Sequence, residues 1–573
     1  MIEIYTPQGY RKDEKEMKRA LFLALIAVVF WMLPGGAEAA PGKFDPESYS
    51  APKIEDLYLV IIRDPDAQIL ALQRGQVHIL GDLHRPVDVD ALALDPKVNL
   101  SLASGFHGFF LGFNVRTFPW NRVELRQAAW QSLPRERIVR DLFAGYAEPL
   151  STFLPPVSPY YQPDVTAYPF NPDAARKRLA DAGWTWSEDN VLVSPEGERI
   201  PPQRLLSPTA SVAPTTAELA ARAADALTAI GIPVSSEPMD FATMISRLNE
   251  RNFQMYVLAW QMTRDPDSLY AFYSSKMDIP GGYNIPGISD PELDVVLDRL
   301  RFAPDAMSAL AAASEAQKKL AELAPVAPIY SRYSISAVSR EWKGTLVTDR
   351  VTADNTWSLL AMEPAIGPMR PLYLVQGEEP RALNPFTSSS AYDWQVLGLI
   401  YDSLIAVHPY TLETIPWLAK SWSIETRHDD SGPHTILTFH LREGARWQDG
   451  KPLTADDAAF TYEYLRKNGV PRYFDNVDNI DRIETPNDLT LVVTMKNVSF
   501  WHLHRVGGIP ILPRHIVEKV DDWRSWLPAS VKHPENSSMT QLVGTGPFIF
   551  REYRAGEYVH LKGNKDFWLG RRR

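Results

Sequence analysis

The residues that come closest to a known chemical motif lie at 444–451. Gly444, Gly450 and Lys451 are ordered as in a phosphate-binding loop, but one residue too many separates the two glycines. Pro452 also stands where that loop needs a Ser or Thr hydroxyl for magnesium. The segment therefore predicts a hairpin turn rather than a nucleotide site.

Other catalytic and metal-binding patterns are missing from the sequence. It contains no G-x-S-x-G, H-E-x-x-H or G-x-G-x-x-G, and no pair of acidic residues is marked out for acid–base work. His502 and His504 are spaced to share one side of a strand and ligate a metal. No third ligand stands nearby, which favours exposed or hydrogen-bonded histidines. Cysteine is absent, so thiolate chemistry and disulfides are excluded. We predict no enzyme activity, no metal and no cofactor.

The composition is typical of a large globular protein. A chain of 573 residues is long enough for two or three domains, and it is 45% hydrophobic and 23% charged. The formal net charge of -11 argues against a nucleic-acid partner, because phosphate binding needs a basic surface. The 16 Trp and 23 Tyr suit either a lined pocket or large cores.

Helical and strand patterns alternate along the chain, which predicts an α/β protein with several sheets. A helix is expected over 66–75, closed by Gly75, and another opens at Asn171 and ends at Gly183. Capping boxes are expected at Thr215 with Glu218, before a helix over 219–230 that Gly231 ends, and at Thr454 with Asp457. The expected strands are 57–62, 255–259, 435–441, 489–495 and 558–561.

The N-terminal segment has the layout of a secretory signal peptide, predicted over 1–39. Lys18 and Arg19 precede an apolar run at 21–33, and Ala37-Glu38-Ala39 has the form of a cleavage site. The run is short for a membrane span, although an uncleaved anchor is the alternative. We therefore expect an exported, periplasmic protein whose mature chain begins near residue 40.

Seven motifs follow one another in the second half of the chain. They are ALNP (382–385), LIYDSL (399–404), PWLAKSW (416–422), TFHLREGARW (438–447), DGKPLTADD (449–457), GTGPF (544–548) and NKDFW (564–568). Together they resemble the opening and the most recognisable block of the extracellular solute-binding proteins of family 5, the peptide/nickel class that serves ABC importers.

Motifs that this family normally carries later lie earlier in this chain. They are PKIE (52–55), DPD (64–66), LQRG (72–75), FN (113–114), VELRQA (123–128), Trp260 with DPD (265–267) and SDPELD (289–294). The resemblance covers nearly everything from residue 52 to 573, in the order second part, linker, first part. Read as a circle, Gly570 should adjoin Pro52. We interpret this as a circular permutation, with two half-genes joined by fusion or assembly as the alternative.

The resemblance implies an α/β fold with mixed sheets, in the two-lobed arrangement of periplasmic binding proteins and circularly permuted. The ligand would be buried between two lobes that close about a hinge. Lobe one would comprise 53–105, 335–412 (containing the linker 363–371) and 540–573, lobe two 106–334, and an inserted subdomain of lobe one 413–539.

The resemblance also indicates where the ligand binds. In peptide-binding relatives, an aspartate three residues after the tryptophan that corresponds to Trp260 holds the ligand's amino group. Here Thr263 stands at that position, and Arg264 adds a positive charge. A buried ammonium without a carboxylate is costly, which favours an anionic or N-blocked ligand. In the alternative, Arg264 pairs structurally with Asp265 or Asp267.

Three aromatic residues, Trp260, Tyr392 and Trp394, are expected to line the pocket as flat apolar walls, with ordinary core packing as the alternative. The predicted ligand-binding residues are Trp260, Thr263, Arg264, Asp265, Tyr392 and Trp394.

The function implied by the resemblance is capture of a small peptide or peptide-like solute and its delivery to an ABC permease in the inner membrane. The protein is expected to act as a monomer and to bind no nucleic acid. The alternative is a ligand sensor or chaperone-like binder on the same fold that feeds no transporter.

Overall fold

A computed structural model describes residues 44–83, 85–162, 165, 168–211, 213–279, 282–430 and 432–570. The predicted signal peptide over 1–39 lies outside these residues. Among the described residues, no helix combines the length and the apolar character that a membrane crossing requires.

Strand β1 (Asp56–Ile61) joins the two halves of the chain in one seven-stranded sheet. Its Leu57 lies opposite Leu561 of β23 in an antiparallel pair and opposite Leu372 of β15 in a parallel pair. The two halves therefore do not form separate, non-contacting bodies. The strand order is β22 (Phe548–Arg554), β23 (Tyr558–Gly563), β1, β15 (Leu372–Gln376), β2 (Ile79–Leu80), β12 (Ser334–Ser339) and β3 (Val98–Ala103).

Helices α2 (Pro65–Gln73) and α3 (Pro86–Ala93) share an apolar core with this sheet. Leu72 of α2 and Leu92 of α3 are buried against Ile335 and Val375. The N-cap Asp64 accepts a hydrogen bond from the Ala67 N–H, which satisfies one of the free donors of the first turn. Two short helices, α12 (Thr356–Ala361) and α13 (Ala391–Leu397), flank β15 in the sequence.

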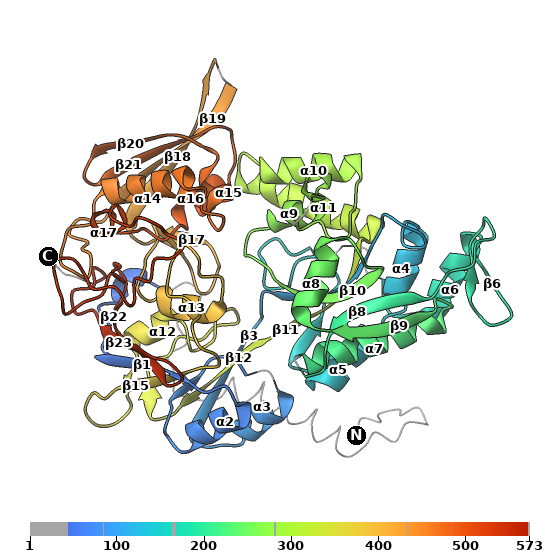
Figure 1. The fold of residues 1–573 in the computed structure, drawn as a ribbon, viewed down its shortest axis with the longest axis horizontal. Helices are drawn as coiled ribbons and strands as arrows, with labels where there is room; N and C mark the ends of the chain where they lie inside the picture. The colour runs from blue at the N-terminus through green and yellow to red at the C-terminus, as the bar shows by residue number, and fades with distance from the viewer. Residues whose placement is uncertain are drawn as a thin grey trace, which may run out of the picture. The chain divides into compact units, whose positions relative to one another are not determined.

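A six-stranded mixed sheet is built from residues 107–332. Strands β4 and β10 pair antiparallel in its centre, and α7 packs on β8 and β9 (Figure 1). The order is β5 (Ala147–Pro149), β11 (Val326–Arg332), β4 (His107–Phe113), β10 (Met255–Gln261), β8 (Gln203–Pro208) and β9 (Val234–Met239). The helices of this region are α4 (Val123–Gln131), α5 (Arg135–Phe143), α6 (Pro172–Asp181), α7 (Pro214–Ala229), α8 (Phe241–Asn249), α9 (Ser268–Tyr273), α10 (Pro291–Arg301) and α11 (Ala306–Leu323).

A four-stranded antiparallel sheet follows in the second half of the chain, and α14 (Ala455–Lys467) packs on two of its strands (Figure 1). The predicted capping box of Thr454 and Asp457 is confirmed at the start of α14. The order is β18 (Ala419–Asp429), β19 (Gly432–Leu441), β21 (Thr490–Met495) and β20 (Ile480–Asn487). The short helix α15 (Phe474–Val477) precedes β20 in the chain, and α16 (His502–Gly507) and α17 (Arg514–Val517) follow β21. Two-residue and three-residue strands form three further pairs, β6 (Thr185–Trp186) with β7 (Leu192–Val193), β13 (Trp342–Lys343) with β14 (Glu363–Pro364), and β16 (Ile405–Val407) with β17 (Thr414–Pro416).

Most sequence-based element predictions are confirmed, including an α/β fold with several mixed sheets and the five strands. The capping box at Thr215 and Glu218 is wrong. Helix α7 begins at Pro214 with Ala213 as N-cap and no side-chain cap, because proline is preorganised for the first helical position. His502 and His504 lie on the helix α16, not on a strand. The turn at 444–451 is confirmed by a hydrogen bond of 2.9 Å from the Trp447 N–H to the Lys451 carbonyl.

The segments at the proposed permutation joints lie at the surface of the seven-stranded sheet region. A Cβ atom built on Gly570 would lie 2.5 Å from the Tyr49 carbonyl oxygen, so residue 570 contacts residues 49–50 directly. In the linker 363–371, Glu363 pairs with Lys53 at 2.9 Å, and Ile366 is 91% exposed. The chain then enters β15 at Leu372.

A buried carboxylate, Asp402, connects four of the sequence motifs. Its oxygens accept hydrogen bonds from Trp417 Nε1 at 2.8 Å, Thr545 Oγ1 at 2.8 Å and Trp568 Nε1 at 3.1 Å. The Trp417 and Trp568 rings also meet edge to face, with centroids 4.8 Å apart. Burial raises the pKa of Asp402, and the three donors oppose that rise. Three segments far apart in the sequence are therefore held by one side chain.

We expect Asp402→Ala to lower the free energy of unfolding by about 3 kcal/mol or more, because it leaves three buried donors unsatisfied. Urea denaturation at neutral pH measures the loss. Thr545→Val is the matched control, since it removes a single donor and should cost about 1 kcal/mol. Equal losses in the two variants would contradict the role of Asp402 as the shared acceptor.

Candidate functional site

The candidate site is a cavity of about 450 Å³ that brings together segments far apart in the sequence. The loop after β10 contributes Arg264 and Asp265, and α16 contributes His504. The lining also includes the segment that carries Tyr401 and Asp402, and Trp417. A concave site with few convergent polar groups is the form that small-molecule sites take.

In this cavity, Asp265 binds two other polar residues of the lining, Arg264 and His504. Its Oδ1 accepts from Arg264 Nε at 3.1 Å, and its Oδ2 accepts from His504 Nδ1 at 3.0 Å. Burial alone would raise the pKa of Asp265, but His504 and Arg264 outweigh that effect and hold the pKa below its ordinary value. The carboxylate is therefore charged at neutral pH, with both oxygens already engaged.

Arg264 and His504 also bind the chain where it enters β17. Arg264 Nη1 donates to the Leu412 carbonyl at 2.9 Å, and His504 Nε2 lies 2.9 Å from Thr414 Oγ1. Because Nδ1 of His504 must donate to the carboxylate, Nε2 is free to accept the Thr414 hydroxyl proton in the neutral ring. The cavity wall is thus a continuous hydrogen-bonded chain from Leu412 to Thr414.

A second set of contacts joins the six-stranded sheet region to α16. Trp501 is 1% exposed, packs in the core of that region and donates from Nε1 to the Leu300 carbonyl at 2.7 Å. Arg505 pairs with Asp267, two residues after Asp265. The position of the 263–267 loop is therefore set by α16 as much as by β10.

Of the predicted ligand-binding residues, the structure brings Arg264 and Asp265 together in the cavity wall, and they pair with each other. Thr263 lies beside them, and its Oγ1 donates to the Asp265 carbonyl at 2.8 Å. The structural alternative, an ion pair between Arg264 and Asp265, is thus the arrangement present. A role for these residues in ligand binding stays a prediction.

The three predicted aromatic residues are not part of this cavity lining. Trp260 packs on Phe272 and Tyr283, with ring centroids 4.9 Å and 5.9 Å away. Tyr392 is 37% exposed on α13. The Trp394 indole N–H donates to the Ser388 carbonyl at 2.9 Å.

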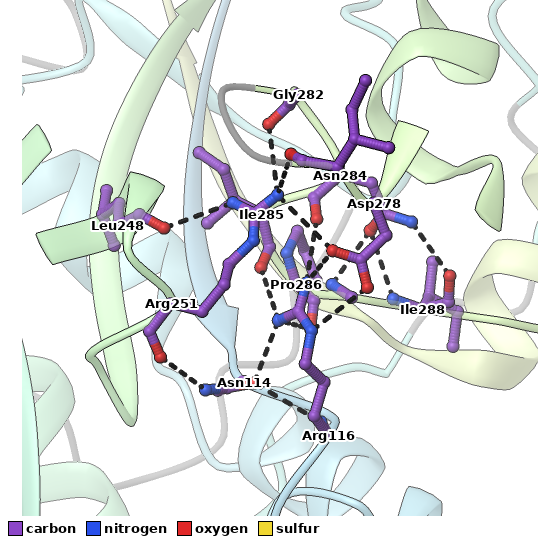
Figure 2. Close-up of polar contacts among 12 residues, drawn as sticks. Asn114, Arg116, Leu248, Arg251, Asp278, Gly282, Asn284, Ile285, Pro286 and Ile288 are labelled. Carbon is purple, nitrogen blue, oxygen red and sulfur yellow. Dashed lines mark hydrogen bonds and ion pairs between the residues drawn. The ribbon is translucent and has the colours of Figure 1, made fainter. Parts of the chain in front are cut away.

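A polar network holds the segment that carries Tyr283 (Figure 2). Arg116 forms a two-pronged ion pair with Asp278 and donates from Nη1 to the Ile285 carbonyl at 3.1 Å. Asn284 accepts from the Gly287 N–H at 2.9 Å. Gly287 has a φ of 77°, and an added Cβ would lie 2.0 Å from the Arg116 guanidinium carbon, so only glycine fits there. The network fixes the backbone beside the Trp260 aromatic group.

Sequence reasoning missed Tyr401, Asp402, Trp417 and His504 as cavity residues. The first three belong to the motifs LIYDSL and PWLAKSW, which signalled the family but not the cavity. His504 was considered only as a metal ligand. Its partner Asp265 lies 239 residues away in the sequence, and no local pattern reports such a contact.

Among the described residues, one cluster has the composition of a metal site: Asp449, His515 and His533. Both histidines bond the same carboxylate oxygen, His515 Nε2 at 2.6 Å and His533 Nε2 at 3.1 Å. His533 Nδ1 accepts the backbone N–H groups of Glu535 and Asn536, so its proton is on Nε2 and points at Asp449. A metal on Nε2 would displace that proton, and the cluster is arranged as a hydrogen-bonded node.

The family model described as "Bacterial extracellular solute-binding proteins, family 5 Middle" matches residues 43–279 and 413–573, more than half of the chain. The chain belongs to this family. The resemblance seen in the motifs is thereby confirmed.

Curated relatives are similar over part of their length. A putative ABC transporter peptide-binding protein of Brucella ovis is 31% identical over 190 residues, 33% of each chain. The peptide transport periplasmic protein SapA of Salmonella typhimurium is 28% identical over 222 residues, 35% of this chain and 37% of SapA. The peptidoglycan-binding protein YepA of Agrobacterium fabrum is 26% identical over 204 residues, 33% of this chain and 29% of YepA. The chain spans about a third of the length of these relatives.

Among solved structures, the oligopeptide-binding protein AppA of Bacillus subtilis, in complex with a nonapeptide, is 20% identical with a TM-score of 0.45. The match covers 53% of this chain and 59% of AppA.

We expect Asp265→Asn to cost about 1–3 kcal/mol of unfolding free energy at neutral pH, because an amide has no negative charge and only one acceptor oxygen for the two donors Arg264 and His504. The lowered pKa in the folded state means that the carboxylate's contribution is present above the ordinary Asp pKa of about 4 and is lost as the pH falls through the folded value. The difference between variant and parent should therefore shrink near pH 3. Urea denaturation at both pH values tests this, with the exposed Asp349→Asn as control. A difference that does not change with pH would rule out the charged pair as its source.

Proposed function

We propose that this protein captures a peptide or peptide-like solute and delivers it to an ABC permease of the inner membrane. The observation that carries the proposal is the cavity of about 450 Å³ whose wall joins the loop after β10 to α16 and the 401–417 segment. Closure around a ligand needs contacts from both sides, and this cavity offers them. Membership of the solute-binding family supports a periplasmic location and a protein without catalytic activity.

We also propose that the ligand is anionic or blocked at its N-terminus. Thr263 offers no carboxylate to a ligand amine, and both oxygens of Asp265 are already bonded. Arg264 uses Nε and Nη1 within the protein, and its remaining Nη2 supplies donors for a ligand anion. Trp260, Tyr392 and Trp394 remain part of the proposal as flat apolar contacts for the ligand.

We expect Arg264→Ala to weaken an anionic ligand by about 1–3 kcal/mol, the cost of a charge-assisted contact. Thr263→Asp should shift preference toward ligands with a free amine. Native mass spectrometry of protein purified from its own host identifies the ligand, and calorimetry then measures both variants. Arg199→Ala, an exposed arginine paired with Asp189 elsewhere, is the control. Unchanged affinity in both site variants would mean that Arg264 and Thr263 are structural.

A separate experiment distinguishes delivery of the ligand to a permease from a role as a sensor that feeds no transporter. Deleting the gene should abolish uptake of the identified ligand, and restoring the chain should recover it. Uptake that is unaffected by the deletion would favour a sensor or chaperone-like binder.

The order of the two halves is proposed to be a circular permutation, with the monomer as the working unit. The contact of residue 570 with residues 49–50 and the pairing of β1 with both β15 and β23 support it. The division into lobes and an inserted subdomain, at the boundaries given above, is proposed on the same basis.

We expect a chain re-ordered as 372–570 followed by 50–364 to fold to a monomer, with the ligand affinity and urea midpoint of the parent. The order of segments along the chain has little effect on the folded structure when the new joint connects segments that are already in contact. A chain re-ordered at Leu258, inside β10, is the control and should not fold. Failure of the first re-ordered chain alongside a folded parent would remove the permutation proposal.

A further inference from the structure

A second cavity, of about 520 Å³, lies where the 446–450 turn meets the hairpin of β22 and β23. Its lining carries four cations, Arg446, Arg551, Lys562 and Lys565, and one carboxylate, Asp566, for a formal charge of +3. The whole chain has a formal charge of -11. Cations are therefore concentrated here in a chain whose net charge is negative. Their mutual repulsion must be offset by negative charge from the protein or from a bound anion.

The protein itself offsets only part of this charge. Lys565 pairs with Glu55 at 2.8 Å, and the Arg446 guanidinium donates to the Gly450 carbonyl at 2.9 Å. Neither Arg551 nor Lys562 forms an ion pair within the described part of the chain. The charge of Lys562 does help to lower the pKa of the nearby Glu55. Two cations in the lining are thus available to an external anion.

The backbone around this cavity is shaped to present these side chains. The pairing of β22 with β23 shifts register between Phe550 and Glu552, which makes Arg551 the extra residue of a bulge. Bulges redirect the side chain that they carry and are common beside binding sites. On the facing turn, Gly450 has a φ of 93° and open space where a Cβ would stand, so its backbone borders the cavity without obstruction.

We propose that this cavity binds a compact, multiply charged oxyanion of the phosphate class, at a site separate from the solute cavity. The formal charge of +2 that remains once the Glu55 partner of Lys565 is counted exceeds the single charge of one carboxylate ligand. Arginine forks match the tetrahedral oxyanion, and Lys562 adds a point charge. Bound between the turn and the hairpin, the anion fastens the edge of the seven-stranded sheet to the segment that Gln448 already ties to the Phe548 carbonyl at 2.7 Å.

The test uses the full chain and a double variant, Arg551→Gln with Lys562→Gln. Its matched control is Arg381→Gln with Lys420→Gln, two exposed cations outside the cavity that give the same change in net charge. Calorimetry with inorganic phosphate and with pyrophosphate, at low salt and neutral pH, measures the free-anion arm. Sedimentation with phosphatidylcholine vesicles, with and without about one third phosphatidic acid, whose phosphomonoester can carry two charges, measures the lipid-headgroup arm.

We expect the double variant to lose at least about ten-fold in affinity in one arm while the control changes by less than about two-fold, with binding weakened by added salt. Loss in the calorimetric arm identifies a free phosphate or pyrophosphate, and loss in the vesicle arm alone identifies a lipid headgroup. Absence of binding in both arms, or equal losses in the double variant and the control, overturns the proposal. None of these readouts depends on the identity of the transported solute.

Discussion

The buried carboxylate of Asp402 is the constraint on which the candidate site depends. A charge that is removed from water must be compensated by donors, and here two tryptophan indoles and a threonine hydroxyl supply them from positions 15 to 166 residues away. The same two tryptophans pack edge to face, so they both donate hydrogen bonds to the carboxylate and contribute apolar packing around it. Asp402 and Trp417 then form part of the cavity wall.

The opposite wall depends on a second compensated carboxylate, Asp265. It differs from Asp402 because its partners Arg264 and His504 carry or can carry charge. His504 lies on α16, and that helix is positioned by the burial of the neighbouring Trp501 in the core around the six-stranded sheet. The buried Trp501 thus positions the loop that follows β10. The hydrogen bonds among Arg264, Asp265 and His504 determine which polar groups that loop presents.

Histidine and carboxylate pairs recur in this protein with different consequences. In the pair of His504 with Asp265, the ring lies in a cavity wall and its second nitrogen meets a hydroxyl. In the cluster around Asp449, a backbone turn already uses the second nitrogen of His533. Burial would raise the pKa of Asp449, but His515, the Lys451 N–H and His533 outweigh it and lower that pKa to about 2. Residue type alone does not separate these cases, because the tautomer depends on neighbours supplied by the fold.

Local signals in the sequence determined the elements and the family. Short β-type runs predicted β1, β10 and β23, glycines at helix ends predicted where α2 and α6 stop, and the motif blocks identified the solute-binding family. These signals are local because they arise from backbone geometry and from contacts within a few residues. The capping box at Thr215 failed because a proline one residue earlier had already started the helix.

Only the tertiary structure decided which of these residues share a cavity. The sequence offered the pairing of Arg264 with Asp265 as an alternative. The bond of Arg264 to Leu412 and the contact of Asp265 with His504, 239 residues away, are indicated by no local pattern. Trp260, Tyr392 and Trp394 were expected to line the ligand pocket, and the structure shows contacts of each with nearby residues that do not line this cavity. Long-range contacts result from the packing of whole sheets and helices, and no short stretch of sequence encodes that packing by itself.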